Sequence, residues 1–164
     1  QQTGVTPDVI TMAKGIAGGV ACGALIAQNE FAGDLRPGMH ASTFGGNSLA
    51  MAAGLATGMT IEQDNLLQHV VDNADHVRQR LETLQMRMPM IREIRVCGMM
   101  IGIDLTIPAG PAVGLCMERG VLINATQETV IRLLPALNIS REDLDHGLDT
   151  VTEVLQYMGE QTSE

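Results

Sequence analysis

A run of apolar residues at helical spacing in the middle of the chain constrains the fold more than any other feature. Between residues 65 and 88, the positions that share this spacing are Leu66, Val70, Ala74, Val77, Leu81 and Leu84. Steps of three and four residues place these side chains on one face of a helix, and Arg and Glu occupy the other face. Pro89 ends the pattern, because proline lacks the N–H that a further turn needs. The segment therefore predicts a long amphipathic helix that packs on a core.

After this helix, short apolar runs alternate with helical segments. We expect strands at 91–96, 100–105, 121–123 and 130–134, and helices at 111–119 and from Ser140 onward. Pro111 is typical of the first turn of a helix, and Ser140 followed by acidic residues is typical of a helix start. The alternation predicts a small α/β domain over residues 80–164.

The residues before the helix have a different character. Val9–Ala13 predicts a buried strand, residues 22–27 predict a second strand, and a glycine-rich turn lies between them. A loop over residues 40–46 then leads to Asn47, which we expect to be the N-cap of a further helix. These strands are too few to close a sheet of their own. Residues 1–79 are therefore expected to be part of a larger domain, with the helix that leads out of it.

Composition and charge argue against several classes of function. The formal net charge is −9 and only 10 residues are Lys or Arg, so the surface repels phosphate backbones and nucleic acid is not an expected partner. No apolar run is long enough for a membrane span, and the first residues lack the features of a secretory signal. No two of the three cysteines have the spacing of a zinc site, so we expect reduced thiols, no metal and a cytoplasmic location.

Lys14 is the first residue that could carry chemistry. It comes directly after the predicted strand and directly before Gly15, where the glycine turn begins. A lysine amine in partly apolar surroundings is uncharged more often than in water and can attack a carbonyl carbon. Strand ends also carry lysines that only face solvent, and from the residues alone this simpler explanation is the stronger one.

The loop Ala41–Asn47 is the second candidate. Its two hydroxyl side chains, Ser42 and Thr43, and the N-terminus of the following helix offer hydrogen-bond donors to an anion such as phosphate. The loop has neither the lysine of a P-loop nor the glycine spacing of a dinucleotide-binding motif. Taken alone, it fits an ordinary turn with an N-cap better.

Arg132 is the third candidate, because it is the charged residue inside the apolar strand predicted at Val130–Leu134. Charged side chains are rarely buried without a partner. Arg132 therefore either faces solvent from an edge strand or binds a carboxylate with its guanidinium group, and the residues alone favour neither.

Together these segments resemble the class III (subgroup II) aminotransferases. Thr11–Gly19 is similar to the segment that carries the cofactor-binding lysine, and His40–Ala50 is similar to the loop between that lysine and a long helix. Val96–Gly102 resembles the glycine-bearing hairpin of the family. Gly120–Leu137 resembles the C-terminal segment of acetylornithine aminotransferases. The order and spacing agree over nearly all of this chain, which would be well under half of a typical subunit.

The resemblance implies a role for each candidate residue. Lys14 would hold pyridoxal phosphate (PLP) as a Schiff base and would move the proton between the substrate carbon and the cofactor carbon. Thr43 would bind the phosphate of the partner subunit's PLP across a dimer interface, and Ser42 would lie against the substrate in that same site. Arg132 would bind the α-carboxylate of the amino acid or of 2-oxoglutarate.

For the whole protein, the resemblance implies transfer of an amino group from N-acetylornithine to 2-oxoglutarate, in arginine biosynthesis, by a homodimer with shared active sites. The fold would be α/β: part of the large domain of PLP fold type I, followed by the small C-terminal α/β domain. Succinylornithine, ornithine and 4-aminobutyrate aminotransferases are alternatives within the family. A truncated, non-catalytic relative that acts as an interaction module is an alternative from another class.

The sequence also departs from the family pattern. The acidic partner of the pyridine nitrogen, in an Asp-Glu-x-Gln segment, is absent, as are the glycine-rich phosphate turn, the aromatic residue that stacks on the ring, and the arginine that binds the distal end of the substrate. Ser48 replaces the proline usual after Gly-Gly-Asn, and Gln127-Glu128 stands where the family often has a Gly-Asn turn. We therefore expect the isolated chain to be inactive.

Overall fold

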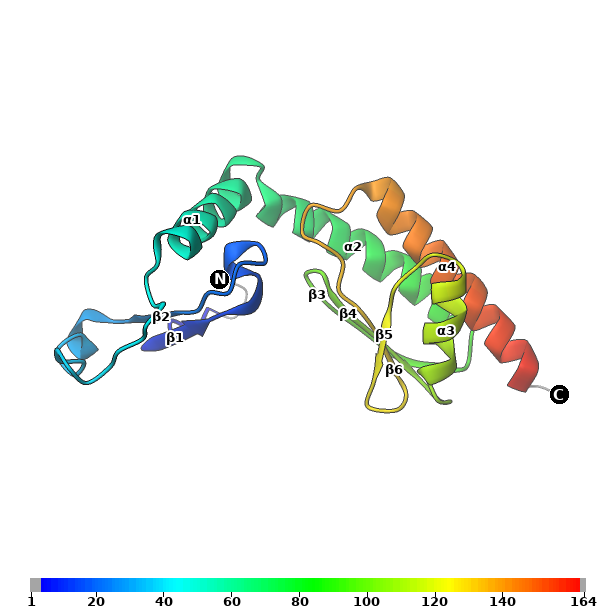
Figure 1. Ribbon diagram of the computed structural model, residues 1–164. Coiled ribbons are helices and arrows are strands. Elements are labelled where there is room, and N and C mark those ends of the chain that lie inside the picture. Colours follow the sequence, from blue (N-terminus) through cyan, green and yellow to red (C-terminus); the bar gives the residue numbers. More distant parts are fainter. Residues whose placement is uncertain (1–3, 163–164) are drawn as a thin grey trace. The chain divides into compact units, whose positions relative to one another are not determined.

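The computed structural model describes residues 4–162 and divides the chain into two compact units (Figure 1). The first unit ends at Asn65 and the second begins at Leu66. The boundary predicted between residues 79 and 80 falls inside a helix of the second unit, because the apolar face of that helix belongs to the core of this unit. The division of the larger protein into domains at residue 80 stays a prediction.

The first unit begins with a two-stranded antiparallel ribbon. β1 (Val9–Met12) pairs with β2 (Ala24–Ala27), so that Met12 lies opposite Ala24. The 3₁₀ helix η1 (Lys14–Ala17) lies between the strands. The sequence predicts a buried strand here, and the burial is wrong: all four residues of β1 are exposed. A ribbon of two strands has no second layer to cover its faces.

After a second 3₁₀ turn, η2 (Asn29–Phe31), and a loop, the chain enters α1 (Ser48–Gln63). Asn47 is the N-cap, as the sequence predicts: its side-chain oxygen accepts a hydrogen bond of 2.9 Å from the Ala50 N–H. This bond satisfies one of the donors that a helix leaves free at its start.

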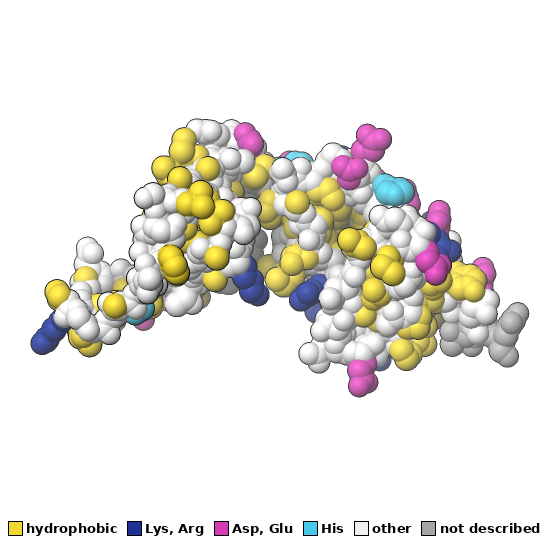
Figure 2. Space-filling view, viewed as in Figure 1, with side chains coloured by type: hydrophobic (Ala, Val, Ile, Leu, Met, Phe, Trp, Pro, Cys, Tyr) yellow, Lys and Arg dark blue, Asp and Glu magenta, His cyan; other side chains and the backbone are white. Residues whose placement is uncertain are grey.

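The surface of α1 is largely apolar. α1 packs on η1, and hydrophobic side chains also gather over its outer surface in Figure 2. The exposed ones are Leu49, Met51, Leu55 and Met59. A helix that is apolar around most of its circumference is typical of one that is covered on several sides in a larger protein.

The second unit is a four-stranded antiparallel sheet packed with helices. The strands, in spatial order, are β3 (Ile91–Cys97), β4 (Met100–Leu105), β6 (Val130–Leu133) and β5 (Asn124–Thr126). The helices are α2 (Leu66–Gln85), α3 (Gly110–Glu118) and α4 (Arg141–Thr162). α2 and α4 lie side by side (Figure 1).

The core of this unit lies between the helices and one face of the sheet. Its fully buried side chains come from β4, β6, α2 and α4, and they include Ile101, Ile103, Leu105, Ile131, Val77, Leu81, Leu148 and Leu155. Successive side chains of a strand point to opposite faces. Gly102 and Asp104 of β4 and Arg132 of β6 therefore lie on the face away from this core.

Most predicted elements of the second unit are confirmed. α2 ends at Gln85, ahead of Pro89, and Gly98, with a φ of 56°, joins β3 to β4. Pro111 lies in the first turn of α3. The Ser140 hydroxyl accepts a hydrogen bond of 3.0 Å from the Asp143 N–H at the start of α4.

The strand predicted at residues 121–123 is wrong, because these residues follow the end of α3 and β5 begins only at Asn124. Gly120 has a φ of 79° and its N–H donates to the Met117 carbonyl at 3.0 Å. The Val121 N–H donates to the Cys116 carbonyl at 3.0 Å. These two bonds form a Schellman motif, so the Val121 N–H is already paired with the helix and is not free to pair with a strand.

Candidate active site

Lys14 has an unusual backbone conformation. It begins η1 with a φ of 57°. For a residue with a side chain this left-handed conformation costs on the order of 1–2 kcal/mol, because Cβ comes close to a backbone carbonyl oxygen. The turn around it is held by the Gly18 N–H, which donates to the Gly15 carbonyl at 3.1 Å. Backbone strain of this kind is concentrated at functional sites.

The Lys14 side chain is exposed. Within residues 4–162, its amine makes no hydrogen bond or ion pair. Lys14 is therefore not paired with a carboxylate of the described part of its own unit. An uncommitted amine at a strained turn is available for a covalent bond to a ligand.

The loop between residues 42 and 47 is shaped by short turns. The Gly45 N–H donates to the Ser42 carbonyl at 3.4 Å, and the Asn47 side-chain amide donates to the Phe44 carbonyl at 2.8 Å. A Cβ on Gly45 would lie 2.9 Å from the Ser42 Cβ, so the turn requires glycine there. Ser42 and Thr43 are both exposed.

Several hydrogen-bond donors of this loop have no partner within residues 4–162. In the part of the chain that the structure describes, the backbone N–H groups of Thr43 and Phe44 and the two hydroxyls of the loop make no hydrogen bond. Together with the first turn of α1, they can surround a phosphate. A reactive amine at Lys14 and free donors in the loop are what this part of the chain would have to supply to PLP, so these residues fit the cofactor.

Arg132 lies on β6, opposite Gly102 of β4 and Asn124 of β5. Its side chain is exposed, and within residues 4–162 its guanidinium group makes no hydrogen bond or ion pair. β6 is an inner strand of the sheet, so the edge-strand explanation for this arginine is wrong. Binding of a carboxylate by Arg132 stays a prediction.

Arg132 lines an open cavity of about 520 Å³ on the second unit. Arg78 and Arg95 line the same cavity, and Gly102 lies between Arg95 and Arg132 in the cross-strand row. A Cβ on Gly102 would lie 3.6 Å from the Arg95 Nε and 3.6 Å from the Val130 Cγ1. A cavity with three guanidinium groups attracts a small anion such as a carboxylate.

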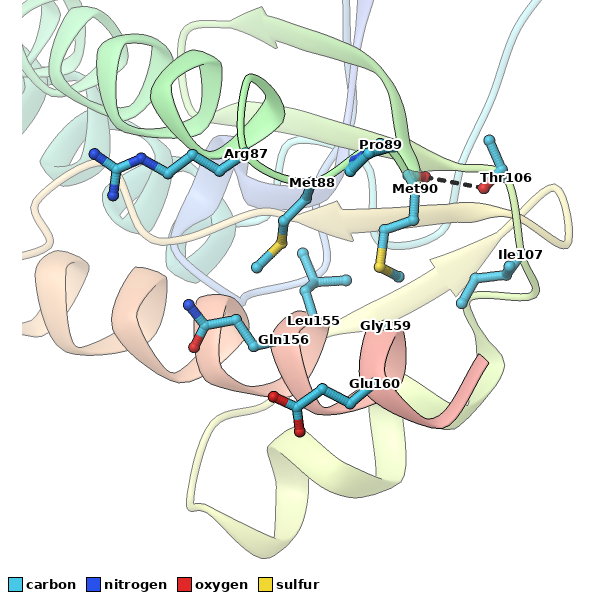
Figure 3. A pocket seen from close by; sticks show the side chains of 10 residues that line it. All are labelled: Arg87, Met88, Pro89, Met90, Thr106, Ile107, Leu155, Gln156, Gly159 and Glu160. Atoms are coloured by element: carbon cyan, nitrogen blue, oxygen red, sulfur yellow. Dashed lines mark hydrogen bonds between the residues drawn. The ribbon is translucent and has the colours of Figure 1, made fainter. Parts of the chain in front are cut away.

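A separate cavity of about 710 Å³ in the second unit has a different character (Figure 3). Met88, Met90 and Leu155 line it, and Arg87 points away from the two methionines. The Thr106 hydroxyl donates to the Met90 carbonyl at 3.4 Å. The lining is mostly apolar and brings no nucleophile together with a base, so we do not assign the chemistry to it.

Metal and thiol chemistry have no support in the described part of the chain. No three His, Cys, Asp or Glu side chains of residues 4–162 are arranged to hold a metal ion. Within residues 4–162, none of the three cysteines, Cys22, Cys97 and Cys116, forms a disulfide. Burial raises the pKa of the Cys116 thiol, which makes it a poor nucleophile. No helix of residues 4–162 has both the length and the apolar character needed to cross a membrane.

The predicted site residues fall in both units. Lys14, Ser42 and Thr43 belong to the first unit, where no hydrogen bond joins their side chains within the described residues, and Arg132 belongs to the second. The neighbours of Arg132, Gly102 and Arg95, were missed by reasoning from sequence. The register of the antiparallel strands brings them together, and the hairpin motif around Gly98 is the only local signal for it.

Comparisons with known proteins identify the family of this chain. The family model described as "Aminotransferase class-III" matches residues 1–155. Acetylornithine aminotransferase 1 of Bordetella parapertussis is 42% identical over 162 residues, which are 98% of this chain and 41% of that protein. The chain thus spans about two fifths of the length of the curated relatives it matches.

Solved structures show the same fold. Acetylornithine aminotransferase from Elizabethkingia anophelis is 26% identical with a TM-score of 0.86, over 93% of this chain and 42% of that one. Ornithine delta-aminotransferase of Plasmodium falciparum is 25% identical with a TM-score of 0.91, over 98% of this chain and 43% of that one. The predicted fold class, a part of the PLP-dependent transaminase fold, is confirmed. The chain belongs to the class-III aminotransferases.

Proposed function

We propose that this chain is part of a PLP-dependent enzyme that transfers the amino group of N-acetylornithine to 2-oxoglutarate. Class-III aminotransferases depend on PLP, and curated relatives at about 40% identity carry the name acetylornithine aminotransferase. The observation that carries the proposal is Lys14, whose amine makes no hydrogen bond or ion pair within residues 4–162 and stands on a strained turn, in a segment that resembles the one carrying the family's cofactor-binding lysine. A role in arginine biosynthesis, in the cytoplasm, follows from this donor.

Each candidate residue has one task in this reaction. PLP, when bound, withdraws electrons from the substrate bond that loses its proton. Lys14 Nζ would hold the cofactor covalently, and the same nitrogen, once free, would carry the proton that leaves the substrate carbon. The donors of the loop, with Thr43 foremost, would bind the phosphate of the cofactor.

Arg132 orients the substrate. In the half-reaction with 2-oxoglutarate, its forked guanidinium would bind the α-carboxylate through two parallel hydrogen bonds, and this would fix the orientation of the reacting α-carbon. The amino donor reacts at its δ-carbon but also carries an α-carboxylate, so we propose that the same guanidinium group binds both substrates. We further propose a homodimer, in which Ser42 and Thr43 contribute to the partner's site.

A second donor, ornithine, is supported by one observation. The ornithine delta-aminotransferase of Plasmodium falciparum has a TM-score of 0.91 to this chain, slightly above that of the acetylornithine enzyme of Elizabethkingia anophelis. The two donors differ in the acetyl group at the α-nitrogen. Turnover of the full-length protein with each donor separates the two functions.

The test of the proposal is reduction with borohydride, which makes the bond between the cofactor and a lysine permanent. We expect PLP to be fixed to the full-length protein at Lys14, and the Lys14→Ala variant to lose both the fixed cofactor and, by orders of magnitude, the transamination rate. Peptide mapping identifies the modified lysine. Normal fixation of PLP in the Lys14→Ala variant would show that another lysine holds the cofactor.

A further inference from the structure

Asp104 is an acidic neighbour of Arg132 on the same face of the sheet. In the register of β4 and β6, Gly102 lies opposite Arg132 and Asp104 lies opposite Val130. Asp104 is therefore the diagonal neighbour of Arg132, at a Cα separation of about 7–8 Å, which a long side chain can bridge. An ion pair between the two would occupy the guanidinium group that the substrate needs.

The structure shows a different pairing for Asp104. Its side chain is only 12% exposed, its Oδ1 accepts a hydrogen bond of 2.8 Å from the Thr129 hydroxyl, and its Oδ2 lies 3.9 Å from Arg95 Nη2. Arg92 Nη1 lies 3.7 Å from the same Oδ2. Arg132, as described above, forms no ion pair within residues 4–162. Arg92 and Arg95 of β3 thus pair with the carboxylate of Asp104.

Arg95 is well placed for this task. It lies opposite Gly102, and its Nε passes 3.6 Å from the position that a Gly102 Cβ would take. Because Gly102 has no side chain, Arg95 can extend over it toward Asp104. Arg95 Nη1 donates to Glu93 Oε2 at 2.9 Å, so this nitrogen already has a carboxylate partner.

We propose that Arg95 is a positioning residue: by holding the carboxylate of Asp104, it leaves Arg132 unpaired and open to the carboxylate of the substrate. The inference rests on the proposed function of Arg132. If Asp104 paired with Arg132 for part of the time, the apparent affinity for the substrate would fall by the fraction of Arg132 that remained free. The effect acts on binding and not on the proton transfer at Lys14.

The test uses kinetics of the full-length enzyme with N-acetylornithine and 2-oxoglutarate. Arg95→Gln is expected to raise the KM of both substrates, with little change in kcat. The rise would be about tenfold if Asp104 then occupied Arg132 for about nine tenths of the time. The double variant Arg95→Gln with Asp104→Asn removes the competitor as well, and its KM is expected to return to within about twofold of the parent. A merely structural role of Arg95 would not be rescued in this way.

Two further variants keep the test decisive. Arg95→Lys retains the charge, and since the contact to Asp104 is an ion pair at 3.9 Å and not a forked hydrogen bond, its KM is expected to stay near that of the parent. Arg119→Gln is the matched control, because within residues 4–162 the Arg119 guanidinium group donates only to the Leu115 carbonyl, on the adjacent helix α3. Its KM is expected to be unchanged.

The outcomes are distinguishable. An unchanged KM in Arg95→Gln, or a raised KM that Asp104→Asn does not rescue, overturns the role of Arg95 and leaves the proposed function in place. An unchanged KM in Arg132→Lys overturns the role of Arg132 and the inference with it. If Arg95→Gln does not fold, the double variant and Arg95→Lys still decide, since a raised KM in both contradicts the proposal.

Discussion

Arg132 and Gly102 lie directly opposite each other on the inner strands β6 and β4. Gly102 adds no side chain to this face, and Arg95 extends over it, with its Nε 3.6 Å from the position that a Gly102 Cβ would take; Arg95 and Arg132 therefore line the same cavity. On an edge strand, an exposed arginine needs no explanation. An exposed arginine on an inner strand, beside a glycine and without an ion pair in the described residues, fits the proposed binding of a carboxylate.

Replacement of Arg132 by Lys tests this arrangement. Lysine keeps the charge but cannot make the two parallel hydrogen bonds of a guanidinium–carboxylate pair. The loss of one charged hydrogen bond, about 1.5–3 kcal/mol, predicts a rise of tenfold or more in the KM of both the amino donor and 2-oxoglutarate. The visible spectrum of the bound cofactor should stay the same. Unaltered KM values would mean that Arg132 only faces solvent.

The local elements could be predicted from the sequence because their signals are local. The apolar spacing that defines α2, the cap at Asn47 and the hairpin turn at Gly98 each depend on residues within a few positions of one another. The strand predicted at residues 121–123 was wrong because two local signals compete there. The apolar residues fit a strand, but the cap at Gly120 binds the Val121 N–H to the end of α3. Here one local signal overrode another.

Burial and register were beyond reach because they depend on distant segments. The apolar residues of β1 predict burial, yet no layer covers them in this unit. Arg95, Gly102 and Arg132 come together because β3, β4 and β6 pair with one another in the sheet. Along the chain, α3 and β5 lie between β4 and β6. A sequence read without alignment marks Arg132 as unusual but does not identify its neighbours.

The contact between α2 and α4 predicts a dependence of stability on pH. His76 Nε2 lies 2.5 Å from Asp145 Oδ1, and Arg80 Nη1 lies 2.8 Å from the same oxygen. The hydrogen bond from His76, and then that from Arg80, lower the pKa of Asp145 below its ordinary value of 3.8, against the opposing effect of burial. A carboxyl group with a lowered pKa stabilises the fold above its unfolded pKa and loses this contribution as the pH falls through its folded pKa.

Asp145→Asn should therefore lower the free energy of unfolding at pH 6 by about 0.5–1 kcal/mol, the range for partly exposed ion pairs, and the difference should shrink below about pH 4. Urea denaturation at a series of pH values measures it. Asp75→Asn is the control, because Asp75 is an exposed aspartate of α2 that forms no ion pair within residues 4–162. A difference that stayed constant between pH 6 and pH 3 would contradict the role of the carboxylate charge.

Two glycines inside α4 predict different responses to the same substitution. Glycine in a helix costs about 0.5–1 kcal/mol relative to alanine. A Cβ on Gly147 would meet no atom within 4 Å, whereas a Cβ on Gly159 would lie 3.3 Å from the Met90 Sδ at the cavity of Figure 3. Gly147→Ala should gain the full amount in the free energy of unfolding, and Gly159→Ala should gain less because Met90 must move. Equal gains in urea denaturation would show that Met90 shifts freely.

The chain of 164 residues is expected to have no transaminase activity by itself. It spans about two fifths of the length of its curated relatives, and its proposed groups are open to water: Lys14, Ser42 and Thr43 are all exposed. PLP acts as an electron sink only when a carboxylate partners its pyridine nitrogen and its ring is held. Of the aromatic residues that could hold the ring, Phe44 is 79% exposed.

The assay for this prediction is formation of glutamate from N-acetylornithine and 2-oxoglutarate by the purified chain. Exposed lysines form loose imines with added PLP, so a visible colour is not evidence of a site. Free PLP sets the background rate, and the Lys14→Ala form of the same chain is the matched control, because it removes the one lysine of this sequence and keeps every arginine. Turnover well above free PLP that is lost in Lys14→Ala would show that these residues build a complete site, and the roles given to Thr43 and to the partner subunit would then be wrong.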